Sequence, residues 1–432
     1  MGLGNIWRFP YLAGVHGGGA FVLIYLVSVA AVGVPILIAE LLIGRRGRHS
    51  PINTMRELAR QEGRSENWRF LGWIMLFITI LANAFFSVIG GWTVAYALTA
   101  GAGHLESVTA AESHAILTAL LANPWTMFFW HSVFMVATVT IVAGGLCSGL
   151  ERAVKVLMPT LFLILIVLVI SAAVNGDFAE GVRYLLIPDF SQINAEVILT
   201  AMGQAFLSIS VGVGVMLTYG AYLPQEISIS RSAIIIVAAD TLVALLAGMA
   251  IFPIVLAHDL ALDQGPGLIF VTLPIAFGKM PGGTQLGALF FILFFVAALT
   301  SAIGLLQVFV SWLEEKIVRS RWQLALLGGA IVWILGIAPL LSFNVWSDIR
   351  PLSILPFFKD KSIFGLLEYL TANIMTPLSG LLLAVFAGWH MTTASTFKEL
   401  NMKSRTSYSL WWLLIRYLVP VSVTIIFLVN LV

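Results

Sequence analysis

The stretch GLGNIWRFPY at residues 2–11 decides the fold that we expect, because it is largely apolar and yet interrupted. Glycine costs about 1 kcal/mol relative to alanine inside a helix, so Gly2 and Gly4 mark a segment that can unwind. The stretch FLSISVGVG at residues 206–214 has the same character, with two glycines following two serines. Paired glycines also serve simple helix packing, but an unwound segment would supply carbonyls for a cation and a helix amino terminus for an anion.

The composition indicates a membrane protein. Of the 432 residues, 59% are hydrophobic and 10% are charged, whereas soluble domains carry about 25% charged residues. Apolar runs of about 20 residues recur along the chain, and each is long enough to cross a bilayer as a helix. Barrel strands would be about ten residues long and would alternate apolar with polar residues. We therefore expect an all-α polytopic protein with spans at residues 3–15, 19–44, 69–101, 125–146, 152–174, 196–222, 232–257, 287–313, 322–342, 364–389 and 409–431.

Positive charge assigns the loops to the two sides of the membrane. The loop at 45–69 holds seven arginines, and this loop and its alternates hold sixteen of the 23 Lys and Arg residues, against five in the opposite loops. Cytoplasmic loops carry such an excess, so we expect the 45–69 loop inside the cell inner (plasma) membrane and the carboxyl terminus outside. The sequence has no phosphate-binding P-loop and no His-Glu-x-x-His motif. These absences disfavour an ATP-driven pump and a zinc protease, and an ion gradient is the remaining energy source.

Residues 2–11, followed by Gly17-Gly-Gly-Ala-Phe21, resemble the signature of the neurotransmitter:sodium symporter family. Further matches run in order along nearly the whole chain: Pro35, Glu40, Gly44-Arg45, Gly91-Trp92, Met158-Pro159, Gly203-Gln204, Thr218-Tyr219, residues 299–301 and residues 312–315. The resemblance implies one transporter domain over 1–432, with an inverted five-helix repeat at 1–174 and 196–389 and an extra span at 409–431. The two interrupted spans then occupy corresponding positions of the two repeats.

The resemblance implies two sodium sites. One corresponds to the Ala297 carbonyl with Thr300 and Ser301, whose spacing places them on one helix face. Hydroxyl and carbonyl oxygens suit a hard cation, although Thr and Ser in a helix also bond back to their own backbone. The other corresponds to Asn5, Ser208 and Asp240, together with the substrate carboxylate. A carboxylate at membrane depth needs a partner, and a cation is a suitable one.

Chloride is not expected to be required. The chloride pocket of the animal relatives corresponds to five positions here: Tyr25, Gln204, Ser208, Asp240 and Ala244. Ala244 replaces the serine of the chloride-dependent members, while many relatives have Asn at the position of Asp240. We therefore expect Asp240 to supply the negative charge.

The substrate is expected between the two interruptions. The positions implied to contact it are Gly2, Gly4, Ala82, Phe86, Leu207, Ser208, Ser210, Val213, Ser301 and Leu305. None of them is charged, which favours a neutral, hydrophobic amino acid, although each apolar residue could equally be ordinary helix packing. Phe86 stands where the family usually has Tyr, and Leu207 stands where it usually has Phe, so substrate affinity and lid geometry should differ from the family pattern.

Four residues correspond to gates. Arg8 and Glu368 match an outer pair that could also be a static ion pair, and Tyr222 and Glu315 match positions that close the cytoplasmic path. Glu40 is interpreted as a structural anchor near the first span. Relatives have a half-helix before the glycine motif, and Val is common where this chain has Met1. We expect in-frame codons for that half-helix upstream, and little coupled transport if the chain truly begins at Met1.

These observations predict a sodium-coupled amino-acid symporter that works by alternating access in a lipid bilayer, with no enzymatic activity and no nucleic-acid partner. A proton-coupled or sodium-independent transporter of the same fold remains an alternative, with Asp240 titrating. A non-transporting sensor or scaffold is the other alternative, favoured by the shortened first helix. The sequence leaves the exact substrate and the oligomeric state open.

Overall fold

The computed structural model describes residues 2–258, 260, 267–355, 358–402 and 404–430. This part of the chain is built from helices and contains no β-strand, apart from one isolated bridge between Gly18 and Pro188. It has nine helices that are long and apolar enough to cross a membrane. The expected first and sixth spans are not among the nine, because the first is short and the sixth is divided in two.

The first half of the molecule begins with a short helix and continues with long ones. The π-helical turn η1 (Gly4–Arg8) runs into α1 (Phe9–Val15). The following spans are α2 (Gly19–Ser28) with η2 (Val29–Gly33) and α3 (Val34–Gly47), α5 (Arg69–Gly101), α7 (Pro124–Ala143), and η4 (Leu146–Glu151) with α8 (Arg152–Asn175). This order agrees with the predicted spans within a few residues.

The second half has the same order of spans as the first, one built from short helices followed by four long ones. It opens with the pair α10 (Ala195–Ser208) and α11 (Val215–Ala221). The longer spans are α12 (Ile229–Ala257), α14 (Gly283–Lys316), α15 (Arg321–Leu341), and α16 (Ile363–Tyr369) with η8 (Leu370–Met375), α17 (Thr376–Val385) and η9 (Phe386–His390). The extra span is α19 (Arg405–Leu413) with η10 (Leu414–Leu418) and α20 (Val419–Asn430).

Short helices lie in the connections between the spans. They are α4 (Pro51–Gln61), η3 (Glu66–Trp68), α6 (Ala110–Ala122), α9 (Phe178–Leu186), η5 (Phe190–Gln192), η6 (Leu268–Thr272) with α13 (Leu273–Lys279), and α18 (Thr393–Leu400). Helix α4 begins with Pro51, which suits a first turn because its missing N–H would have no partner there. Length and hydropathy do not reveal such helices, because they are too short to cross a bilayer.

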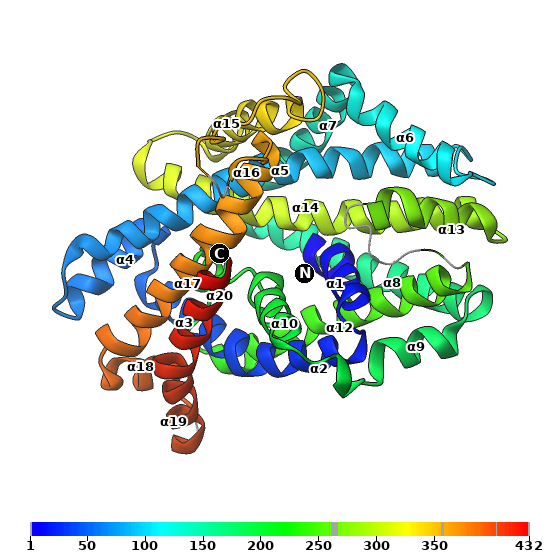
Figure 1. The fold of residues 1–432 in the computed structure, drawn as a ribbon. Helices are drawn as coiled ribbons and strands as arrows, with labels where there is room; N and C mark the ends of the chain where they lie inside the picture. Colours follow the sequence, from blue (N-terminus) through cyan, green and yellow to red (C-terminus); the bar gives the residue numbers. More distant parts are fainter. Residues whose placement is uncertain (1, 259, 261–266, 356–357, 403, 431–432) are drawn as a thin grey trace.

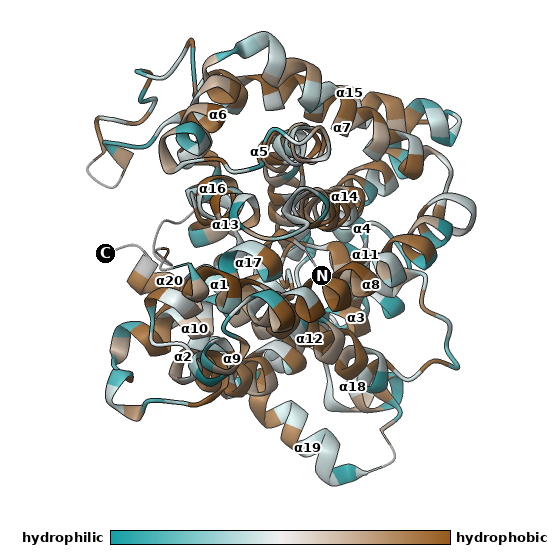
Figure 2. Cartoon of the chain, turned by 90° about the vertical axis from the view of Figure 1, so that its right-hand side faces the viewer, coloured by the Kyte–Doolittle hydropathy of each residue, from teal (hydrophilic) through white to brown (hydrophobic). Residues whose placement is uncertain are grey.

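The long helices α5 and α14 lie side by side through the middle of the molecule (Figure 1) and are the most buried candidate spans. They form one large hydrophobic core, and a second core surrounds α2, α3 and α12. The described amino-terminal end lies in the interior of the molecule, and η1 contacts α10 and α12. Hydrophobic residues dominate the long helices, and hydrophilic ones gather at their ends and in the connections (Figure 2).

Candidate functional site

The sixth span is interrupted where the glycines and serines predicted a break. Helix α10 ends at Ser208 and α11 begins at Val215. Between them Ser210, Gly212 and Gly214 have φ angles of 54°, 81° and 89°, in the left-handed region that favours glycine. A Cβ on Gly212 would lie 2.8 Å from the backbone nitrogen of Gly380. Both the backbone angle and the close neighbour therefore require glycine at position 212.

Glu40 of α3 holds this break in place. Its Oε2 accepts a hydrogen bond of 3.1 Å from the Gly212 N–H, and its Oε1 accepts bonds of 3.1 and 3.4 Å from the N–H groups of Gly214 and Leu217. The carboxylate is fully buried, and these bonds satisfy donors that the interrupted helix leaves without helical partners. Glu40 thus anchors the interrupted sixth span, a role for which the sequence had suggested the first span.

Asn5 of η1 and Asp240 of α12 meet in the interior. The Asn5 Nδ2 donates hydrogen bonds of 2.7 Å to Oδ1 of Asp240 and 3.2 Å to its backbone oxygen. Both side chains are buried, with 1% and 2% exposure. The Oδ1 of Asn5 is also buried and accepts no hydrogen bond from the described residues. An amide oxygen next to a carboxylate is the donor set that a hard cation such as sodium prefers, so the residues present fit such an ion.

The end of α10 lies against the first span and α2. The Ser208 hydroxyl is 3.3 Å from the hydroxyl of Tyr25, and the Gln204 Nε2 donates a bond of 3.1 Å to the carbonyl of Gly4. Ala244 is fully buried and contributes no polar atom. Two links thus connect four of the expected chloride-pocket positions. Tyr25 contacts Ser208 directly. Gln204 binds Gly4, and the next residue, Asn5, binds Asp240. Asp240 contributes a carboxylate to this region.

The second expected sodium site has its hydroxyls on the predicted face of α14. The hydroxyls of Thr300 and Ser301 both donate to the Ala297 carbonyl, at 3.0 and 3.1 Å. This is the arrangement in which such residues bond back to their own helix. A Cβ on Gly2 would lie only 2.4 Å from the Ser301 Oγ. The absence of a side chain at Gly2 therefore lets the first span approach α14 closely.

These contacts bring the two expected sodium sites to the same short segment. Gly2 lies against Ser301, and one turn later Asn5 binds Asp240. The Asn5 N–H donates to the carbonyl of Gly2 at 3.1 Å, which closes that turn. Asp240 of α12 and Ser301 of α14 thus share one backbone turn as their neighbour.

The expected substrate-pocket residues fall into two groups. Ala82, Val213 and Leu305 are buried in one hydrophobic cluster, and Phe86 packs against it. Leu207 instead lines a cavity of about 110 Å³ together with Arg8. A Cβ on Gly4 would meet no atom within 4 Å, so there is space beside the backbone there.

The two residues expected to form an outer gate do not form a direct ion pair in the described chain. Arg8 and Glu368 interact electrostatically, but within the described chain no nitrogen–oxygen pair between them lies within 4.0 Å. Arg8 lines the same cavity as Thr200 and Asn373. A gap of this kind between two charges, one of which lines a cavity, suits a bridge of water.

At the opposite end of the molecule, Tyr222 and Glu315 line a second cavity of about 160 Å³. Glu315 accepts a hydrogen bond of 2.6 Å from the Ser50 N–H and one of 2.5 Å from Asn53 Nδ2, and it also bonds the Ser50 hydroxyl. His49 Nδ1 lies 3.4 Å from its Oε1. The sequence did not predict that the connection between α3 and α4 would bind Glu315.

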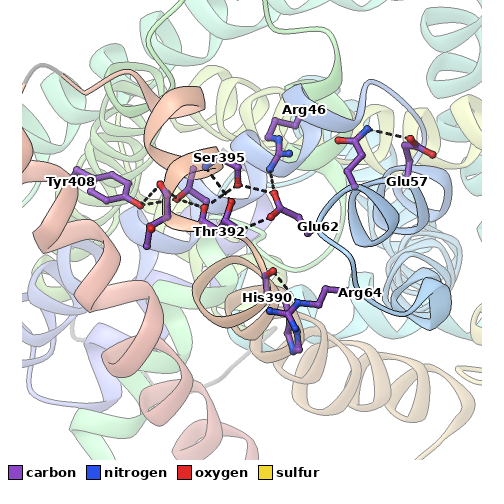
Figure 3. A network of polar contacts seen from close by, with 11 residues as sticks. Arg46, Glu57, Glu62, Arg64, His390, Thr392, Ser395 and Tyr408 are labelled. Atoms are coloured by element: carbon purple, nitrogen blue, oxygen red, sulfur yellow. Dashed lines mark hydrogen bonds and ion pairs between the residues drawn. The ribbon is translucent and has the colours of Figure 1, made fainter.

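A polar network also joins α4 to α18 (Figure 3). Glu62 pairs with Arg46 at 2.7 Å and accepts bonds from the Thr392 N–H at 2.9 Å and the Ser395 hydroxyl at 2.7 Å. Burial opposes ionisation of Glu62, but the hydrogen bonds outweigh it and lower its pKa below the ordinary value. The sequence signal for this network was only the cluster of arginines at 45–69, which had been used to assign the side of the membrane.

Comparison with known proteins adds three findings. The profile of the Sodium:neurotransmitter symporter family matches residues 1–114 and 122–432. The uncharacterized sodium-dependent transporter YhdH of Bacillus subtilis is 35% identical over 99% of this chain and 93% of its own length, and an uncharacterized sodium-dependent transporter of Haemophilus influenzae is 32% identical over 100% and 94%. The crystal structure of MhsT in complex with L-phenylalanine superposes with a TM-score of 0.89 at 36% identity, over 99% of this chain and 95% of that one.

Proposed function

Because the chain belongs to the Sodium:neurotransmitter symporter family, we propose that it is a sodium-coupled symporter that imports a neutral, hydrophobic amino acid by alternating access. The contact between Asn5 and Asp240 carries this proposal, since it places beside an interrupted helix a buried carboxylate and an amide oxygen that accepts no hydrogen bond from the described residues. The bound amino acid of MhsT, L-phenylalanine, supports the substrate class.

The proposed roles follow from the contacts. Asn5, Ser208 and Asp240 would hold one sodium ion, and Ala297, Thr300 and Ser301 a second. Bound sodium supplies positive charge beside the substrate carboxylate. For the second ion, the Thr300 and Ser301 hydroxyls would keep donating their hydrogens to the Ala297 carbonyl, and their lone pairs would bind sodium beside the first span, which Gly2 lets approach.

The break at 209–214 would receive the substrate. The hydrogen bonds from Gly212 and Gly214 to Glu40 fix the backbone of this segment, so its carbonyl and N–H groups stay at set positions. The amino and carboxylate groups of the substrate would be faced by Gly2, Gly4, Ser210 and the segment around Leu207. The side chain of the substrate would be surrounded by Ala82, Phe86, Val213 and Leu305. A preorganised backbone of this kind reduces the ordering cost of binding.

Alternating access would use the two cavities at opposite ends. Arg8 and Glu368 would close the outer side through water, and Tyr222 with Glu315 would close the inner side. We place the loop of residues 45–69 in the cytoplasm and the carboxyl terminus outside, in the cell inner (plasma) membrane, with the two halves at 1–174 and 196–389 as inverted repeats. The charge asymmetry of the loops supports this orientation.

Uptake of a panel of labelled amino acids into proteoliposomes tests the proposal, with the protein expressed from its native reading frame. We expect uptake of L-phenylalanine and aliphatic amino acids that depends on an inward sodium gradient at fixed membrane potential, and that is undiminished when gluconate replaces chloride. Equal uptake with choline in place of sodium and a dependence on a proton gradient would instead favour the proton-coupled alternative. Loss of uptake in gluconate would overturn the proposed role of the Asp240 charge.

A further inference from the structure

Arg416 lies inside the last span and is surrounded by aromatic rings. Its guanidinium carbon is 4.4 Å from the ring centroid of Trp389, 4.5 Å from that of Trp412 and 5.7 Å from that of Tyr417. The backbone is fixed in the same place, because Trp389 Nε1 donates a hydrogen bond of 2.9 Å to the Arg416 carbonyl. Gly388 is in close contact as well, since a Cβ there would lie 2.9 Å from the Arg416 Cα.

The rings leave the hydrogen-bonding capacity of Arg416 unused. Aromatic faces attract the guanidinium charge, but its five N–H groups point outward in its own plane. Within the part of the chain that the structure describes, no oxygen accepts a hydrogen bond from Arg416 and no carboxylate pairs with it, and its Nε is fully buried. An arginine in a membrane span requires such acceptors.

Arg416 lies level with the end of the tenth span, which it contacts through Gly388 and Trp389. Trp389 is the second-last residue of η9, and directly after it the chain enters the polar network of Thr392 and Ser395 (Figure 3). In α19, the hydroxyl of Tyr408 lies 2.7 Å from that of Thr396 and so joins the same network. Helical side chains lean toward the helix amino terminus, and the contact with Trp412 shows that Arg416 does so. Its guanidinium is therefore directed toward the polar side.

The surface around Arg416 is apolar and exposed. Trp389 and Tyr417 are each 49% exposed, and Leu410 and Leu413 are 59% and 52% exposed. Tryptophan and tyrosine gather where membrane meets water. A guanidinium binds a phosphate group through two parallel hydrogen bonds to two phosphate oxygens. The acyl chains of the same lipid would cover the exposed apolar side chains.

We propose that Arg416, Trp389, Trp412 and Tyr417 form a binding site for the phosphate of an anionic phospholipid headgroup in the leaflet that borders α18 and α19. The aromatic rings orient the guanidinium, and its free N–H groups bind the phosphate oxygens. This site lies at the joint between the tenth span and the extra span, away from the proposed sodium and substrate residues. The bound lipid would stabilise the packing of these two spans against one another.

Native mass spectrometry of the full chain in detergent tests the site, with phosphatidylglycerol, phosphatidylcholine and inorganic phosphate as separate probes. We expect the wild type to bind one phosphatidylglycerol tightly and to prefer it to phosphatidylcholine. Arg416→Gln should weaken that binding roughly tenfold, since it removes the charge-assisted hydrogen bonds from the guanidinium to the phosphate. Arg405→Gln is the matched control, because Arg405 is an exposed arginine of α19 with the same charge, and it should change binding less than twofold.

Arg416→Lys distinguishes a specific loss of lipid binding from misfolding of the protein. It retains the charge and the long stem but loses the planar fork, so we expect an intact monomeric protein with binding between the wild type and Arg416→Gln. Equal losses in Arg405→Gln and Arg416→Gln would overturn the proposal, as would equal affinity for phosphatidylcholine. Displacement of the lipid by millimolar inorganic phosphate would also overturn it, because the site would then recognise a free anion.

Discussion

The two proposed sodium sites differ in where their polar atoms find partners. Asn5 and Asp240 lie 235 positions apart and bind one another across the interior. Thr300 and Ser301 bind the Ala297 carbonyl of their own helix. An isolated helix would make the second set of bonds without any fold around it. The first pair can exist only when η1 and α12 are brought together, so it is the stronger structural support for a site.

The largest expected effect is that of Asp240→Asn, which removes the carboxylate from the proposed site of Asn5, Ser208 and Asp240. Removing one partner of a buried charged pair costs about 3–5 kcal/mol, so sodium-dependent uptake in chloride-free buffer should fall by about a hundredfold or more. Asp348→Asn removes the same charge at an exposed position and should leave uptake unchanged. Normal sodium-dependent uptake in Asp240→Asn would contradict the assignment of this site.

Gly212→Ala tests whether the break in the sixth span requires glycine. Alanine would be strained at a φ of 81° and would lie 2.8 Å from Gly380, so we expect thermal unfolding to show a loss of about 2–3 kcal/mol. Gly203→Ala is the control, because a Cβ there meets nothing within 4 Å. This change should be neutral or slightly stabilising in α10. Equal stability of the two variants would show that the break tolerates a side chain.

Ser301→Ala addresses the second site directly. If the hydroxyl is a sodium ligand, the sodium concentration for half-maximal uptake should rise about tenfold, which corresponds to about 1.4 kcal/mol. If it only bonds Ala297, uptake should not change. Ser87→Ala is matched, since Ser87 makes a similar bond to the Ala84 carbonyl at 2.9 Å in α5, and it should leave sodium dependence unaltered.

The smallest expected effect concerns Glu62, which lies outside both sites. Its pKa is lower in the folded protein than its ordinary value of 4.5, so its contribution to stability is complete above that value and is lost as the pH falls through the folded pKa. Glu62→Gln should lower the stability at pH 7 by less than about 1 kcal/mol. The difference between wild type and variant should disappear in acid, as thermal unfolding between about pH 7 and pH 3 would show. A constant difference across that range would contradict the proposed role of its charge.

Much of the fold was predictable because a bilayer imposes a simple rule on sequence. Each long span had to be continuously apolar, and runs such as 232–257 and 287–313 agree with α12 and α14 within a few residues. The break after Ser208 was also predictable, since Gly212 and Gly214 are poor helix formers. The connecting helices α4, α6 and α18 were not predicted, because they are short and their apolar faces are defined only by the helices that they cover.

The candidate site shows the same division at the level of single residues. The sequence by itself determined which residues can be ligands: the amide, carboxylate and hydroxyls at Asn5, Asp240 and Ser301, and the glycines that let the backbone open. Only the tertiary structure decided that Glu40 binds the sixth span, that Gly2 lies against Ser301, and that Glu315 binds the loop at Ser50. The physical reason is that a residue's chemistry is local, whereas a hydrogen-bond partner is selected by the packing of helices far apart in the chain.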